Sequence, residues 1–377
     1  MKMRRVSAIA LKELLQVWRD PRSLMLALLM PAMQMLLLGY GVNLDITHVP
    51  TCTYDEEGSQ LSQALLKRFE ASRYFDLVAS LHNQRQIRGA MDSGRCEIAI
   101  VIPADFSRQI SEFHHASVQA IVDATNDNTA TIATAYANAV VEGFSSDIRL
   151  KRAALRGEAP PPPPIAVQPR VWFNEGLESR NFIIPGIIAL VLALVGALLT
   201  SLTVAREWER GTMELLLSTP VTALEMMIGK LLPYFVIGLI DAGICLGFAL
   251  LVFHVPFRGA FTTLLLTTAL FLVVVLNIGY LLSVLIRNQL GASQIAMFVT
   301  IMPISLLSGY AFPIDQMPAA IRAITYVIYA RYFVTILKAV FLKGSGMGAL
   351  LGPISALILY DVLVVWIASR AFRKRIA

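Results

Sequence analysis

Long apolar stretches recur along the chain, separated by short charged connections and by one long polar segment. A helix that crosses a bilayer needs about 17–25 predominantly apolar residues. Six stretches reach or exceed that length, at residues 23–44, 181–205, 228–253, 261–286, 291–309 and 347–368. The pattern predicts an α-helical membrane protein with six transmembrane helices.

Residues 1–22 carry basic side chains between apolar ones that recur at helical spacing. They predict an amphipathic helix on the cytoplasmic membrane surface, ending near Asp20 and Pro21 because proline cannot continue it. A cleaved signal peptide is excluded, because the apolar run at 23–42 is too long for a signal core and no small-x-small site follows it. We therefore expect 23–44 to be a retained first transmembrane helix.

Residues 45–178 are polar, and short strand patterns alternate there with helical ones. Strands are predicted at 51–54, 74–79, 95–102 and 118–123, and helices at 59–72, 83–92 and 104–113. This alternation predicts a compact α/β domain inserted after the first transmembrane helix. A long helix at 126–156, a stiff spacer of five prolines at 160–164 and a returning strand at 169–174 complete the segment.

Composition narrows the class of protein further. The chain is 56% hydrophobic and only 15% charged, which excludes a soluble protein of ordinary composition. Its net charge of +6 would suit nucleic acid, but the basic residues lie beside apolar spans and form no continuous patch. We therefore expect membrane lipids as partners and no nucleic acid.

Basic residues in short connections indicate the cytoplasmic side of a membrane protein. The N-terminal helix, the 206–230 connection, Arg287 and the C-terminal tail all fall on one side of the six-span arrangement. Basic residues within 310–344 fall on the other side, but four segments agree, and a domain as long as 45–178 is exempt from the rule. Both termini are therefore predicted to be cytoplasmic, with 45–178 outside.

The connection after the second span is charged and rich in helix-forming residues. Its charged residues are Arg206, Glu207, Glu209, Arg210 and Glu214, with Gly211 and Thr212 as a break. Short apolar pieces at 213–217 and 224–228 flank a turn at Ser218, Thr219 and Pro220. Two short amphipathic pieces joined at a proline predict a segment at the membrane surface that is available to a partner. The alternative is an interfacial helix that only anchors the bundle.

The run A-R-E-W-E-R-G-T-M-E-L-L-L-S-T-P at 205–220 resembles the cytoplasmic signature of ABC-2-type export permeases, R-E-[RW]-E-x-G-T-x-E-x-L-L-x-[ST]-P. In that family the segment forms a coupling helix that docks on a separate ATPase. The matching positions are Arg206, Glu207, Glu209, Gly211, Thr212, Glu214 and Pro220, and we add Arg210 between them. The order of elements along the whole chain also fits the family.

The resemblance implies the permease subunit of a bacterial inner-membrane exporter that moves a drug, a lipid or a lipid-linked compound. The expected partners are a cytoplasmic ABC ATPase and a second permease chain, identical or a sister subunit, with a periplasmic adaptor left open. This chain needs no cofactor, because ATP and Mg²⁺ would be bound by the ATPase. Residues 310–344, interrupted by Pro313, Asp315 and Pro318, would form re-entrant or surface helices on the outer side.

Three polar residues fall inside predicted spans, and burial of a lone carboxylate in hydrocarbon costs several kcal/mol. Asp241 and Asp361 are acidic, and Asn277 is the milder case. Such residues either face a substrate path or subunit interface, or are protonated or hydrogen-bonded packing groups. The family signature includes none of the three.

Cysteine use is sparse. Cys52 and Cys96 fall in predicted strands of the outer domain, and Cys245 lies in a span. A bridge between the first two is open in an oxidising compartment, but two cysteines make no disulfide framework, so we expect unpaired buried thiols. No Cys/His spacing predicts a metal site.

The chain carries no enzyme signature of its own. It has no G-x-x-x-x-G-K-[ST] phosphate loop, no G-x-S-x-G and no H-E-x-x-H. ATP hydrolysis would therefore come from another polypeptide. Two rival classes stay open: an ion-driven transporter that uses Asp241 and Asp361, although no inverted repeat is evident, and a sensor, although no cytoplasmic output domain is evident.

Overall fold

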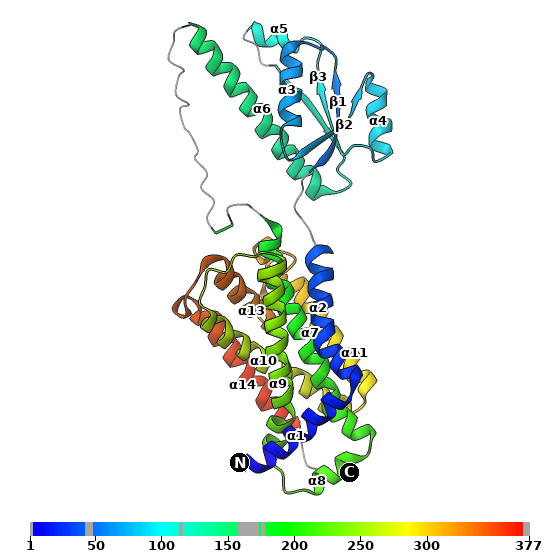
Figure 1. Cartoon of the computed structure of the whole chain (residues 1–377), viewed down its shortest axis with the longest axis vertical. Helices are drawn as coiled ribbons and strands as arrows, with labels where there is room; N and C mark the ends of the chain where they lie inside the picture. Colours follow the sequence, from blue (N-terminus) through cyan, green and yellow to red (C-terminus); the bar gives the residue numbers. More distant parts are fainter. Residues whose placement is uncertain (1–2, 42–47, 113–115, 157–172, 175–177, 372–377) are drawn as a thin grey trace. The chain divides into compact units, whose positions relative to one another are not determined.

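The computed structural model describes residues 3–41, 48–112, 116–156, 173–174 and 178–371. The chain divides into two compact units (Figure 1). The helical unit comprises Met1–Leu44 and Arg170–Ala377, and the α/β unit comprises Asp45–Pro169. The predicted proline spacer at 160–164 and most of the predicted strand at 169–174 lie outside the described residues, and Phe173 and Asn174 are not in a strand.

The α/β unit is built on a four-stranded sheet in the order β2-β1-β3-β4. Its strands are β1 (Val49–Asp55), β2 (Phe75–Leu81), β3 (Ile98–Ile102) and β4 (Gln119–Val122). The first three run parallel, and β4 pairs antiparallel with β3. All four strands lie where the sequence predicts them, within about four residues at each end.

Helices cover both faces of this sheet (Figure 1). Alternate residues of β3 point to opposite faces, so Ile98 and Ile100 join one core and Ala99 and Val101 the other. The first core contains residues of α3 (Gln60–Glu70) and α6 (Asp127–Arg156), and the second contains residues of α4 (Gln84–Asp92). The short α5 (Phe106–Ser111) follows β3. The predicted helices are therefore confirmed.

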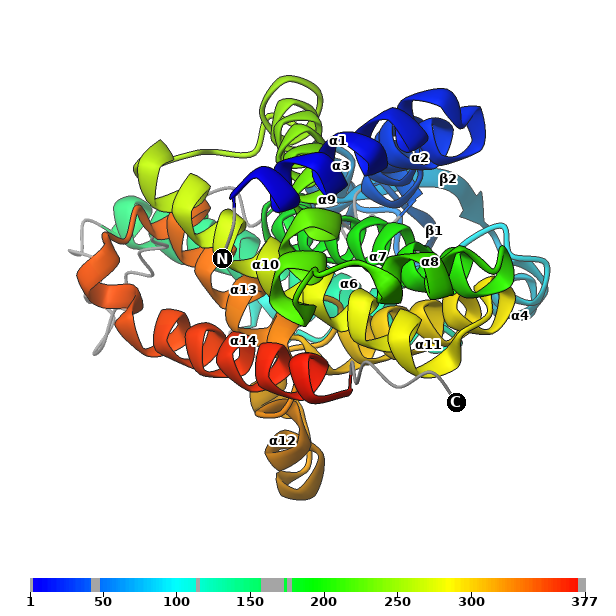
Figure 2. The ribbon, with the colours of Figure 1, turned by 90° about the horizontal axis from the view of Figure 1, so that it is seen from below.

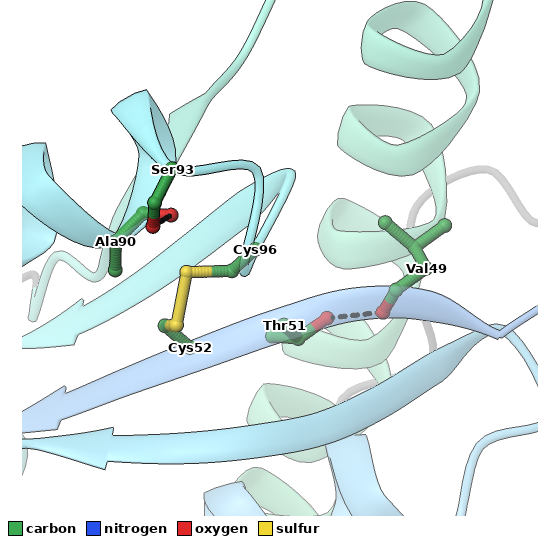
Figure 3. Close-up of a disulfide and its surroundings, with 6 residues drawn as sticks. All are labelled: Val49, Thr51, Cys52, Ala90, Ser93 and Cys96. Atoms are coloured by element: carbon green, nitrogen blue, oxygen red, sulfur yellow. Dashed lines mark hydrogen bonds between the residues drawn. A yellow bond between two sulfur atoms is a disulfide. The ribbon is translucent and has the colours of Figure 1, made fainter.

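Cys52 and Cys96 form a disulfide, so the expectation of unpaired thiols is wrong (Figure 3). Cys52 lies on β1, and Cys96 lies two residues before β3, which is the neighbour of β1 in the sheet. Strand pairing brings the two Cα atoms to 5.7 Å, within the range a disulfide needs. The sequence places both residues in strands but does not show which strands are neighbours.

The helical unit is organised around α7 (Ser179–Glu209), whose side chains are almost all buried from Asn181 to Glu207. Helix α7 packs against most of the other long helices of the unit. They are α2 (Pro21–Gly41), α9 (Ala223–Gly247), α10 (Phe261–Ile286), α11 (Gln289–Leu307) and α13 (Tyr329–Lys338). Helix α14 (Leu351–Ala371) packs on α10 and α13, and α1 (Met3–Arg19) packs on α9 and α2.

Among the described residues, five helices are long and apolar enough to cross a membrane. They span Ser179–Glu209, Ala223–Val252, Phe261–Ile286, Gln289–Leu307 and Met347–Ala371. The predicted first span is a helix, α2, of 21 residues, but it is not among these five. Ala319–Thr325, which is α12, and Tyr329–Lys343 are bent by 87° and form either a broken span or a re-entrant loop. Six spans and the re-entrant segment therefore stay predictions.

Gly279 lies where α10 packs directly on the backbone of α7. A Cβ at this position would lie 2.6 Å from the Ala197 carbonyl oxygen and would also clash with the Thr200 hydroxyl. We expect Gly279→Ala to lower the free energy of unfolding by about 1–3 kcal/mol through overpacking. Detergent unfolding curves of the purified chain would measure it. Gly243→Ala on α9, where nothing lies within 4 Å, is the control, and equal losses in the two variants would contradict the prediction.

Candidate coupling site

The charged connection is a short helix held between a glycine and a threonine. Helix α7 ends at Glu209, and Gly211 takes the left-handed conformation, with φ of +70°, that turns the chain into α8 (Thr212–Ser218). The Thr222 hydroxyl then accepts from the Glu225 amide while the Glu225 carboxylate accepts from the Thr222 amide. This capping box starts α9. The break predicted at Gly211 is thus present.

Glu207 points into the protein and is only 4% exposed. Its Oε1 accepts from Lys12 Nζ at 2.6 Å and from Lys230 Nζ at 3.5 Å. The Thr212 hydroxyl also donates to its carboxylate. Glu207, one of the positions that match the coupling signature, is thus bound to α1 and α9 of its own chain.

Lys230 is 1% exposed and joins two carboxylates. Its Nζ donates to Glu13 Oε1 at 2.5 Å and to the Thr203 carbonyl at 3.3 Å, besides its contact with Glu207. Glu13, Glu207 and Lys230 are buried, and Lys12, whose side chain is 48% exposed, pairs with Glu207 from the surface. We call the three buried residues together with Lys12 the buried ion-pair cluster, and it holds two acidic and two basic side chains. Because charges taken out of water need close partners, this balance makes the burial of the three possible.

Further contacts tie α1 to the same region. The Arg5 guanidinium donates to the Pro220 carbonyl and lies 3.7 Å from the Glu225 carboxylate. A Cβ at Gly229 would lie 2.8 Å from Ile9 Cβ, so the glycine lets α1 approach α9 closely. Figure 2 shows α1 running beside α9. α1, the end of α7 and the start of α9 are therefore joined by charges as well as by packing.

Some of the other residues of the 205–220 signature are bound to partners within the chain, and the rest point outward. Arg206 is buried, 3.9 Å from the Asp20 carboxylate, and its Nε donates to Gln289 Oε1 at 3.4 Å. Glu209 accepts from the Gln289 amide at 2.7 Å and from the Gln289 side chain. Glu209 is exposed as well, although it is bound to Gln289. The other exposed residues among the described part of 206–220 are Arg210, Gly211, Thr212, Glu214, Leu215, Ser218 and Pro220. We call them the α8 face.

The intramembrane residues do not form one cluster. Asn277 Nδ2 donates to Asp361 Oδ1 at 3.3 Å, which joins α10 to α14. Asp241, 2% exposed on α9, has no hydrogen-bond partner for its Oδ1 within the described chain. An ion-driven mechanism that uses Asp241 and Asp361 together therefore gains no support from their positions.

Sequence reasoning missed Glu13, Lys12 and Lys230. Glu13 lies four residues before Val17 and seven after Val6, on the buried face of α1, and Lys230 stands in an apolar stretch of α9. A single charge on an apolar helix face is a signal that it has a partner elsewhere. The sequence does not show that Lys12 pairs with Glu207, or that Lys230 pairs with both Glu13 and Glu207.

The site holds charge but no reactive group. In the part of the chain that the structure describes, no three His, Cys, Asp or Glu residues are grouped to hold a metal ion. Its outward residues leave an exposed surface on one side, and its inward residues join α1, α7 and α9 on the other.

Comparison with known proteins agrees with this architecture. The family model described as ABC-2 family transporter protein matches residues 23–370. The chain belongs to the ABC-2 transporter family, as its resemblance at 205–220 predicts. It is 39% identical to the probable multidrug ABC transporter permease YbhS of Escherichia coli (strain K12), over 91% of this chain and 89% of that protein.

Two further relatives from the same organism are similar over nearly their whole length. The probable multidrug ABC transporter permease YbhR is 30% identical over 97% of both chains. The inner membrane transport permease YhhJ is 26% identical over 87% of this chain and 86% of that protein. The chain is thus a permease subunit of an ABC exporter and not an enzyme, because ATP hydrolysis lies in a separate subunit. ABC-2 permeases generally work with a cytoplasmic ATPase and often as dimers.

Proposed function

We propose that the α8 face docks on a cytoplasmic ATPase and that the buried ion-pair cluster carries the resulting movement into the membrane. The observation that supports this is the double role of α8. One side is exposed, with Glu214 outward and Leu215 72% exposed. On the other side, Thr212, the first residue of α8, donates to Glu207 at the end of α7, and Glu207 in turn binds Lys12 and Lys230. A push on α8 therefore reaches α1, α7 and α9 together.

The proposed orientation places α1, α8 and the C-terminus in the cytoplasm and the α/β unit in the periplasm. Basic residues in the short connections support it. The disulfide of the α/β unit supports it independently, because disulfides persist in oxidising compartments such as the bacterial periplasm. The expected arrangement is six transmembrane helices with α1 on the inner surface.

The proposed cargo is an amphipathic compound, such as a drug, a lipid or a lipid-linked molecule. Two relatives carry the word multidrug in their names. Many exposed side chains on α9, α11 and α14 are large and apolar, which suits contact with lipid, with cargo or with a second permease chain. That chain is expected to be a second copy or a sister subunit, and a periplasmic adaptor stays a further prediction.

Charge reversal of Glu214 is the direct test of docking. Glu214→Lys is expected to lower the yield of co-purified ATPase at least tenfold, since a charge at the centre of an interface is worth about 1–3 kcal/mol. The amount of permease in the membrane should not change, because Glu214 is exposed. The measurement is pull-down of co-expressed candidate ABC ATPases with the tagged permease.

Glu70→Lys in the α/β unit is the matched control, an exposed glutamate at the end of a helix. If Glu214→Lys recovers as much ATPase as Glu70→Lys, docking through the α8 face is ruled out. Glu207→Lys is not a clean docking variant, because it puts a third positive charge beside Lys12 and Lys230 in a buried cluster.

A further inference from the structure

An apolar groove of about 350 Å³ lies between α9, α10 and α14. Six of its lining residues are Leu231, Phe235, Val273, Leu276, Asn277 and Val365. Ile228 and Leu232 also line the groove, and both are more than a third exposed. All three helices belong to the set that is long and apolar enough to cross a membrane. A molecule within the membrane could therefore reach this groove from the side.

One wall of the groove is polar. Asn277 is 3% exposed, and its Nδ2 donates to the Val273 carbonyl at 2.9 Å and to Asp361 Oδ1 at 3.3 Å. Its Oδ1 is buried and has no partner among the described residues. Asp361 lies four residues before Val365, on the same face of α14, and its side chain is partly exposed. Asn277 thus holds the Asp361 carboxylate beside the groove.

Asn277, which lines the groove, and Asp361, which adjoins it, offer hydrogen-bond acceptors and negative charge. The two Nδ2 hydrogens of Asn277 are used within the protein, which leaves its oxygen and the carboxylate oxygens of Asp361. Within the described chain, no basic side chain forms an ion pair with Asp361. A carboxylate in a membrane span requires a cation or a proton, so the complementary ligand is a donor with positive charge.

A positively charged donor could come from a phospholipid headgroup or from a free amine. The distance of Asn277 and Asp361 from the helix ends distinguishes the two. Asn277 lies nine residues before the end of α10 at Ile286, about 14 Å along the helix. Asp361 lies ten residues from each end of α14, about 15 Å. An ethanolamine headgroup stays at the membrane surface, so a phospholipid would present only its acyl chains here. A free amphipathic amine can bring its ammonium group to this depth.

We propose that this groove binds an amphipathic organic amine, with the ammonium group on Asp361 and the apolar body between α9 and α10. The proposal rests on the proposed function, because it specifies the class of cargo. Asn277 is a positioning residue that fixes the carboxylate. Asp361 adjoins the groove through its hydrogen bond with the lining residue Asn277. Asp241 takes no part, because it neither lines the groove nor forms a hydrogen bond to a lining residue within the described chain.

The test uses the full-length permease, without ATPase or ATP, in phosphatidylcholine nanodiscs. The probe is dansylcadaverine, a fluorescent primary amine whose emission changes in an apolar site, and its N-acetyl derivative is the uncharged control. Asp361→Asn keeps an acceptor for Asn277 but removes the charge. We expect it to weaken dansylcadaverine binding at least tenfold and to leave the weaker binding of the acetylated probe unchanged.

Two further variants make the result specific. Asp241→Asn should leave both affinities unchanged, and Val365→Trp, which fills the groove, should abolish binding of both probes. Equal affinity of dansylcadaverine for wild type and Asp361→Asn, or retained binding in Val365→Trp, would overturn the proposal. Competition by phosphatidylethanolamine in the nanodisc would assign the site to a lipid headgroup and also overturn it. The binding assay contains no ATPase, so a failure of the docking proposal would not change its result. The two proposals can therefore be rejected independently.

Discussion

Lys230→Met is expected to lower the free energy of unfolding of the helical unit by about 3–5 kcal/mol, the usual cost of removing one partner from a buried ion pair. Lys230 contacts both Glu13 and Glu207, at 2.5 and 3.5 Å. Without it, Glu207 keeps Lys12, but Glu13 remains buried with no ion-pair partner among the described residues. Unfolding of the purified permease by added denaturing detergent, followed by tryptophan fluorescence, would measure the loss.

Restoring charge balance should recover most of that loss. The double variant Glu13→Gln and Lys230→Met removes one charge of each sign and leaves Glu207 paired with Lys12 at 2.6 Å. Lys343→Met, at an exposed lysine, is the surface control. If Lys230→Met costs no more than Lys343→Met, or if the double variant is less stable than the single one, the cluster does not hold α1 as inferred.

Local patterns predicted most elements of the fold because each depends on residues close in sequence. The apolar run at 261–286 coincides with α10, and the alternation within 45–178 predicts the strands and helices of the α/β unit. The predicted end of the N-terminal helix near Asp20 and Pro21 is confirmed: α1 ends at Arg19, and α2 begins at Pro21, because proline is well tolerated in a first helical turn. Membrane topology and span number depend on the bilayer and remain predictions.

Contacts between residues far apart in the chain could not be predicted from the sequence. Glu13 and Lys230 are separated by 217 positions, and nothing in either segment names the other as a partner. For the same reason Glu207 was expected at a docking surface: the signature shows a dense group of charges but not which of them turn inward. The outward members, such as Arg210 and Glu214, are the ones that we propose for docking.

The disulfide between Cys52 and Cys96 is expected to contribute strongly to the stability of the α/β unit. Cys52→Ala with Cys96→Ala is expected to destabilise the α/β unit by about 4 kcal/mol, since the bridge closes a loop over a separation of 44 residues in the unfolded chain. Proteolysis of the full chain under native conditions would show it as faster cleavage within 45–169. The detergent-unfolding midpoint of the helical unit should stay at the wild-type value, because the two units have separate cores.

The same bridge reports the side of the membrane on which the α/β unit lies. The chain has 3 cysteines, and Cys245 is free. In cells lysed directly into denaturant with a maleimide, the wild-type chain should therefore take up one label without reductant and three after reduction. In a strain that lacks periplasmic disulfide oxidation, all three cysteines should be labelled without reductant. Three labels in wild-type cells without reductant would place the unit in a reducing compartment, and the orientation required for cytoplasmic ATPase docking would then fail.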